Sequence, residues 1–159
     1  MKTAREIAGD TLGHIRRIIH RIHAQSVAIE ASVGVTGPQF WALREVAPEK
    51  DGLPVGVLAE RLALHKATAG RLVDRLVKKK LVTARRSRED RRVVIVELTA
   101  KGRKLASRKA PRPAQADLLV ELERLPKAKL ARIETTLAEL VRLLHAQDEE
   151  VRPLFEDRR

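Results

Sequence analysis

Residues 58–82 read LAERLALHKATAGRLVDRLVKKKLV and decide the fold of this chain. Apolar residues at helical spacing predict a short helix from Val55 to Leu62 and a second helix from Lys66 to about Lys79. The few residues between them make a tight turn, which is typical of a helix-turn-helix. In this motif the second helix lies in the major groove of DNA. The stretch therefore predicts a DNA-binding module.

The second helix has an apolar face and a polar face. The predicted apolar face consists of Ala69, Leu72, Val73, Leu76 and Val77, and the polar face of Thr68, Arg71, Arg75 and Lys78. The N-terminal end of such a helix reaches the base edges, so the candidates for base recognition are His65, Lys66, Thr68 and Arg71. The run 78–80, three lysines, is better placed for phosphates. For each residue alone a solvated helix face is the alternative, and their clustering favours DNA contact.

A β-hairpin is predicted directly after this helix, in LVTARRSREDRRVVIVELT, residues 81–99. Its strands are expected over 81–86 and 91–98, with an arginine-rich tip between them. The candidate DNA contacts of this wing are Arg86, Arg88, Asp90 and Arg92. An arginine inserted into the narrow, negative minor groove gains from the local field there. The Asp90 carboxylate is expected either to hold the Arg92 guanidinium extended or to form an ordinary surface ion pair with it.

The net charge of +12 is concentrated in the middle of the chain. Residues 53–104 contain 15 Lys/Arg and 5 Asp/Glu, whereas the segments on either side are each close to neutral, at +1. One basic face on an otherwise balanced molecule indicates a polyanionic partner. A basic surface that serves solubility alone would be spread more evenly.

The flanks of the basic centre read as helices that pack against a second copy of the chain. Residues 5–30 form an amphipathic helix, and a heptad seam follows Pro126, made by Leu130, Ile133, Leu137, Leu140 and Leu144. We expect a mostly α fold with a small β-hairpin wing (α+β), in which dimerisation helices flank a winged helix-turn-helix domain. The predicted ranges are 1–36 for the N-terminal dimerisation helix, 37–99 for the DNA-binding domain, 100–148 for the C-terminal dimerisation helices and 149–159 for a frayed tail.

Composition argues against several other classes of protein. No apolar run approaches the roughly 18 residues of a membrane-spanning helix, and the N-terminus lacks a signal peptide, so a cytoplasmic protein is expected. Without cysteine there is neither a disulfide nor a thiolate metal site. The sequence contains neither a Gly-rich phosphate loop nor a carboxylate pair beside a histidine, so we do not expect an enzyme. His20 and His23 are spaced so that they could bind a metal, but apart from His14 no further ligand lies nearby. Neither a metal nor another cofactor is therefore expected.

The chain resembles the MarR family of bacterial transcription regulators over roughly residues 12–145. The resemblance rests on GPQFWALREVA, on the stretch 58–82, and most specifically on Asp90, Arg91, Arg92, Val96, Leu98, Thr99 and Gly102 after the wing. It implies a winged-helix homodimer that binds a pseudo-palindromic operator and acts as a ligand-responsive repressor. The alternative is an architectural, weakly sequence-selective DNA-binding protein with the same fold. It also implies that Arg92 is the wing arginine that enters the minor groove.

Two positions depart from the family pattern. His65 stands where such proteins usually have a Ser or Asp that caps the recognition helix. The loss of that side-chain acceptor should lower the stability of the helix by about 1 kcal/mol. Lys80 stands where they usually have the glycine that ends this helix in a left-handed conformation. The family also suggests a small aromatic or anionic effector, with a pocket wall made by His14, Ile18, Trp41 and Arg44, although each of these four also suits an ordinary core or surface position.

Overall fold

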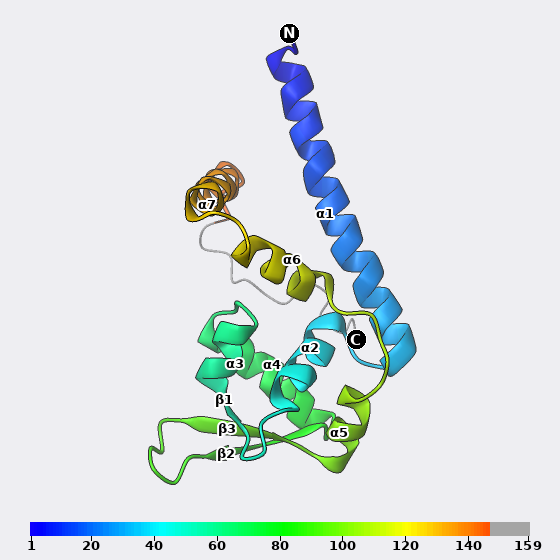
Figure 1. Cartoon of the computed structure of the whole chain (residues 1–159), viewed down its shortest axis with the longest axis vertical. Helices are drawn as coiled ribbons and strands as arrows, with labels where there is room; N and C mark the ends of the chain where they lie inside the picture. The colour runs from blue at the N-terminus through cyan, green and yellow to red at the C-terminus, as the bar shows by residue number, and fades with distance from the viewer. Residues whose placement is uncertain (147–159) are drawn as a thin grey trace.

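The computed structural model describes residues 1–146 as a mostly helical molecule with one small sheet (Figure 1). The helices are α1 (Ala4–Val33), α2 (Gly37–Val46), α3 (Val55–Arg61), α4 (Lys66–Lys78), α5 (Ala100–Ala106), α6 (Ala114–Glu123) and α7 (Lys127–Leu143), and the strands are β1 (Leu53–Pro54), β2 (Val82–Arg86) and β3 (Val94–Leu98). The predicted fold class, mostly α with a β wing, is confirmed. The predicted frayed tail, 149–159, lies outside the described residues.

The sheet has three strands in the order β1-β3-β2, where the sequence predicted a two-stranded hairpin. Val82 pairs with Leu98 and Arg86 with Val94, and on the other edge of β3 Leu53 pairs with Val96. Two residues are too few to show strand periodicity, which explains why β1 was missed. Gly52 enters this strand at φ 83°, and a Cβ there would lie 2.5 Å from Glu97 Cγ.

The core lies where α2, α3 and α4 meet the buried side of the sheet. Its largest fully buried side chains include Phe40, Leu43, Leu58, Leu72 and Val96. The helices that carry these side chains are too short to be stable in isolation. The burial of their apolar side chains against one another stabilises each helix. None of the helices within residues 1–146 is both long enough and apolar enough to span a membrane.

The N-terminal helix α1 is longer than predicted and leaves the body of the molecule (Figure 1). Thr3 and Glu6 form a capping box at its start, and the hydrogen bonds from Thr3 lower the pKa of the Glu6 carboxyl. The buried residues of α1 are Ser26, Ile29 and Val33, all in its last third. A helix of this length extends about 45 Å, so most of it stands clear of the core.

The helix that follows the wing, α5, is short. α5 ends at Ala106, several residues before Pro111 and Pro113, and the non-helical segment continues to the start of α6 at Ala114. Proline restricts the residue before it to extended conformations, which keeps this segment out of a helix. The amide of the Gln25 side chain holds it against α1 by donating a 2.5 Å hydrogen bond to the Arg112 carbonyl.

Lys80 ends the recognition helix α4 in the left-handed conformation, with φ 58°. The Lys80 amide donates to the Val77 carbonyl at 2.8 Å, and the Leu81 amide donates to the Leu76 carbonyl at 2.9 Å. This pair of bonds is a Schellman motif, and the burial of both Leu76 and Leu81 supplies its apolar contact. The helix therefore ends in the left-handed conformation that the family pattern implies, and a residue with a Cβ bears the strain.

Lys80→Gly should raise the free energy of unfolding by about 0.5–1 kcal/mol, because relief of the left-handed strain exceeds the entropy that glycine adds to the unfolded chain. Chemical denaturation measures the change. Lys80→Ala is the matched control, since it removes the same charge but keeps the Cβ, and it should give no comparable gain. Equal effects of the two substitutions would contradict the explanation by strain.

Candidate nucleic-acid interface

The helix-turn-helix is built by α3 and α4, joined at Leu62–His65. Leu58 and Leu72 are buried between the helices, and Ala63 turns the chain at φ 51°. The amide of Leu64 donates to the Ala59 carbonyl at 2.8 Å, so the turn uses the same motif that ends α4. The N-terminal end of α4 is thereby held at a fixed angle to α3.

The residues predicted for base recognition do not all lie on the surface. His65 and Lys66 are exposed at the start of α4, Arg71 is half-buried, and Thr68 is buried with 2% of its surface exposed. The placement of Thr68 on the polar face was wrong, because its position on the helix turns it toward the core beside Ala69. Its hydroxyl accepts a 3.4 Å hydrogen bond from Arg71 Nη2. Thr68 therefore positions Arg71 in this structure.

Farther along α4 the predicted contacts lie at the surface to different degrees. Arg75 is half-buried and Lys78 is exposed. Val77, assigned to the apolar face, is 38% exposed, so the buried stripe is narrower than predicted. His65 occupies the N-cap with extended backbone and makes no side-chain cap hydrogen bond, which agrees with the missing cap expected from the sequence.

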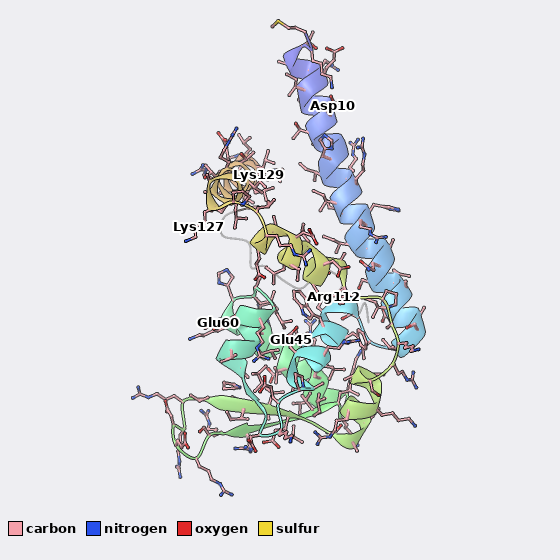
Figure 2. All side chains as sticks on the ribbon, viewed as in Figure 1. Asp10, Glu45, Glu60, Arg112, Lys127 and Lys129 are labelled. Carbon is pink, nitrogen blue, oxygen red and sulfur yellow. The ribbon has the colours of Figure 1, made fainter. Side chains whose placement is uncertain are left out.

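The wing is a loop between β2 and β3 that projects from the body, with side chains extending from it (Figure 2). The Ser87 amide donates to the Val93 carbonyl at 2.8 Å, and the Val93 amide donates to the Asp90 carbonyl at 2.9 Å. Ser87 Oγ also accepts from the Glu89 amide at 3.2 Å. This role of Ser87 was not predicted from the sequence, although serine at the start of a polar loop is a known turn signal.

Asp90 acts on the backbone of the wing. Its carboxylate accepts a 2.9 Å hydrogen bond from the amide of Arg92. The expected contact with the Arg92 guanidinium was therefore misplaced: in this short loop the carboxylate meets the nearer amide. Asp90 fixes where the Arg92 side chain starts, and that side chain remains exposed.

Two other wing arginines are used partly for structure. Arg86 Nη1 donates to the Arg91 carbonyl at 2.7 Å, which braces the loop, while Arg88 is exposed at the tip. Arg85 pairs with Glu97 across the strands at 2.7 Å. The exposed arginines of this tip therefore lie on a loop whose backbone is held by hydrogen bonds within the protein.

A junction of four residues joins α4, the wing and α5. Thr99 Oγ1 lies 2.9 Å from the Lys80 carbonyl and 3.1 Å from the Leu81 carbonyl, and it accepts from the Gly102 amide at 3.0 Å. A Cβ on Gly102 would lie 1.9 Å from the Leu81 oxygen. Only glycine permits this approach, so the end of α4 and the base of the wing are held at one point.

The predicted effector residues separate into two groups. Trp41 and Arg44 line a hollow of about 310 Å³ together with Glu45, Arg112 and Pro113, where α2 faces the segment before α6 (Figure 2). The Trp41 indole N–H donates to Glu45 at 3.0 Å. His14 and Ile18 lie on the projecting part of α1 and are exposed, outside this hollow in the single chain.

No group of three or more His, Asp or Glu side chains able to hold a metal ion occurs among residues 1–146. His20 and His23 lie on the exposed surface of α1.

The fold and this surface define the class of the protein as a winged helix-turn-helix protein. Residues 33–93 match the model of the MarR family, which spans α2, the helix-turn-helix and most of the wing. The resemblance drawn from the sequence is therefore confirmed, and the chain has a MarR-type fold. No curated protein sequence matches it.

Solved structures agree with this fold over most of the chain. The transcriptional regulator PcaV from Streptomyces coelicolor, in complex with its natural ligand, is 25% identical with a TM-score of 0.54, covering 86% of this chain and 93% of PcaV. The transcriptional regulator BldR from Sulfolobus solfataricus is 23% identical with a TM-score of 0.54, covering 91% and 99%. The S. aureus MepR–DNA complex is 19% identical with a TM-score of 0.54, covering 90% and 99%.

Proposed function

We propose that this protein is a sequence-specific double-stranded DNA-binding transcription regulator that works as a homodimer on a pseudo-palindromic operator and represses transcription until it binds a small effector. The observation that carries the proposal is the pairing of an exposed N-terminal end of α4 with a backbone-ordered wing rich in arginine. The MepR structure similar to this chain is a complex with DNA.

The two parts of this surface suit the two grooves of B-DNA. His65, Lys66 and Arg71 lie on the part of α4 that enters the major groove in helix-turn-helix proteins. Arg75 and Lys78 continue toward phosphates, and Arg88 and Arg92 extend from the wing toward the minor groove. Because the wing backbone is hydrogen-bonded before DNA arrives, little loop entropy is lost on binding.

Exposed apolar side chains on the flanking helices support the homodimer. Ile7, Leu12, Ile18 and Ile19 on α1 are each more than half exposed, as are Leu137, Leu143 and Leu144 on or next to α7. An isolated helix that projects into water with such a face is only marginally stable. A second copy would bury these faces and set two α4 helices about one turn of DNA apart.

The effector is proposed to bind in the hollow beside Trp41. Arg44 and Arg112 supply positive charge and the indole supplies an apolar surface, which together suit a small aromatic acid. PcaV, whose fold is similar, is seen with its natural ligand bound. The segment before α6 forms part of the wall, so a ligand there would touch the link between the DNA-binding domain and the helices proposed for dimerisation.

Arg92→Ala should weaken operator binding by about 1–3 kcal/mol, roughly tenfold or more, without changing the oligomeric state. Fluorescence anisotropy with labelled DNA measures the change. Arg103→Ala on α5 is the control for the loss of one charge and should have a much smaller effect. Unchanged binding by Arg92→Ala would show that the wing is not a DNA contact.

Leu137→Asp should convert the dimer to monomer or unfold it, because it places a carboxylate in the apolar stripe of α7. Analytical ultracentrifugation and circular dichroism separate these two results. Thr135→Asp adds the same charge on the other side of the same helix and should leave the dimer intact. A stable dimer of Leu137→Asp would refute this interface.

Competition between the DNA upstream of the protein's own gene and random DNA tests the function itself. A sequence-specific regulator should prefer its own region by about 10³-fold or more, and its affinity should fall steeply as salt rises. Comparable affinity for both DNAs would favour the architectural protein. Binding to neither DNA would contradict a DNA-binding function.

A further inference from the structure

A second cavity lies behind the DNA-binding surface, at the end of α4 opposite to the one that faces the bases. Its volume is about 410 Å³, which is within the range of small-molecule sites. The end of α1, the end of α4 and the first turns of α5 form its walls. The lining residues are Val33, Gly34, Val35, Lys79, Leu81, Lys101, Lys104, Leu105 and Arg108.

The polar wall of this cavity has a single sign of charge. Lys79, Lys101, Lys104 and Arg108 contribute positive charges, and none of the nine lining residues is acidic. A concave site with charges of one sign and apolar walls focuses the electric field and concentrates ions of opposite sign. An anion bound here would also relieve the repulsion among the four cations.

The other wall of the cavity is apolar and firmly packed. Val33, Val35 and Leu81 are buried and form a fixed floor, and the half-buried side chain of Leu105 presents apolar surface beside them. A floor of this kind contributes nothing to the binding of a bare inorganic ion. It favours a ligand that has an apolar body next to its charged group.

Two of the cations are already held in place by the protein. Lys79 Nζ donates to Gln39 Oε1 at 3.2 Å, and Lys101 Nζ donates to the Lys79 carbonyl at 3.2 Å. Gln39 itself is 2% exposed. The ordering of these side chains lowers the entropy that a ligand must overcome when it binds.

We propose that this cavity is a binding site for a small organic anion, a carboxylate or phosphate ester with an apolar body. It shares no lining residue with the hollow beside Trp41. DNA phosphate is the less suitable occupant, because Val33 of α1, Val35 of the segment after α1 and Leu105 of α5 line the cavity together with its cations. A phosphodiester backbone would also make no favourable apolar contact with the floor of the cavity.

Phenyl phosphate is the probe, titrated by calorimetry into the full chain without DNA at constant ionic strength. It should bind saturably, and Lys104→Gln/Arg108→Gln should weaken binding at least tenfold. Arg103→Gln/Lys109→Gln is the matched control, since it removes two exposed charges from the same region that do not line the cavity. Lys104→Arg, which keeps the charge, should retain binding. Circular dichroism verifies that each variant is folded.

Several results would overturn the proposal: no saturable binding by the original chain, an equal loss in both double variants, or inorganic phosphate binding as tightly as phenyl phosphate. A selective loss of DNA affinity in Lys104→Gln/Arg108→Gln, with no binding of phenyl phosphate, would assign the cavity to DNA instead. Because the titration contains no DNA, a failure of this site and a failure of the proposed regulatory function are separate results.

Discussion

The hydroxyl of Thr99 and the missing side chain of Gly102 create the contact on which the proposed DNA-binding surface depends. Through them the carbonyls of Lys80 and Leu81, which end α4, meet the first turn of α5 directly after β3. The end of a helix leaves carbonyls without intrahelical partners, so the hydroxyl of Thr99 both satisfies these acceptors and fixes the direction of the helix end. The end of α4 and the base of the wing are therefore joined at one point by hydrogen bonds and by close backbone packing.

The main elements of this unit could be predicted from local sequence. Helical spacing in 58–82 and β-branched runs on both sides of the arginine tip specify their own elements, because periodicity reports directly on which face is buried. Lys80 and His65 were recognised as departures from the family pattern. In the structure Lys80 is a left-handed residue with a Cβ, and His65 is an N-cap that makes no side-chain cap hydrogen bond.

Other features depend on neighbours that are distant in the sequence and could not be predicted from it. β1 exists only because Leu53 meets Val96 on β3. Thr68 looked like a surface residue by helical phase, but the packing of α4 in the core buries it. Asp90 was paired with the correct residue but with the wrong atom of that residue, since two-residue spacing does not distinguish an amide from a guanidinium. The basic cavity joins α1, α4 and α5, and no local pattern indicates it.

The indole of Trp41 has a practical consequence of its own. The chain contains one tryptophan and no tyrosine, and that indole borders the hollow between α2 and the segment before α6, 9% exposed and hydrogen-bonded to Glu45. Selective excitation of tryptophan would therefore address a single indole in a known environment. The intrinsic emission of the unlabelled protein reports on this one location and on no other part of the fold.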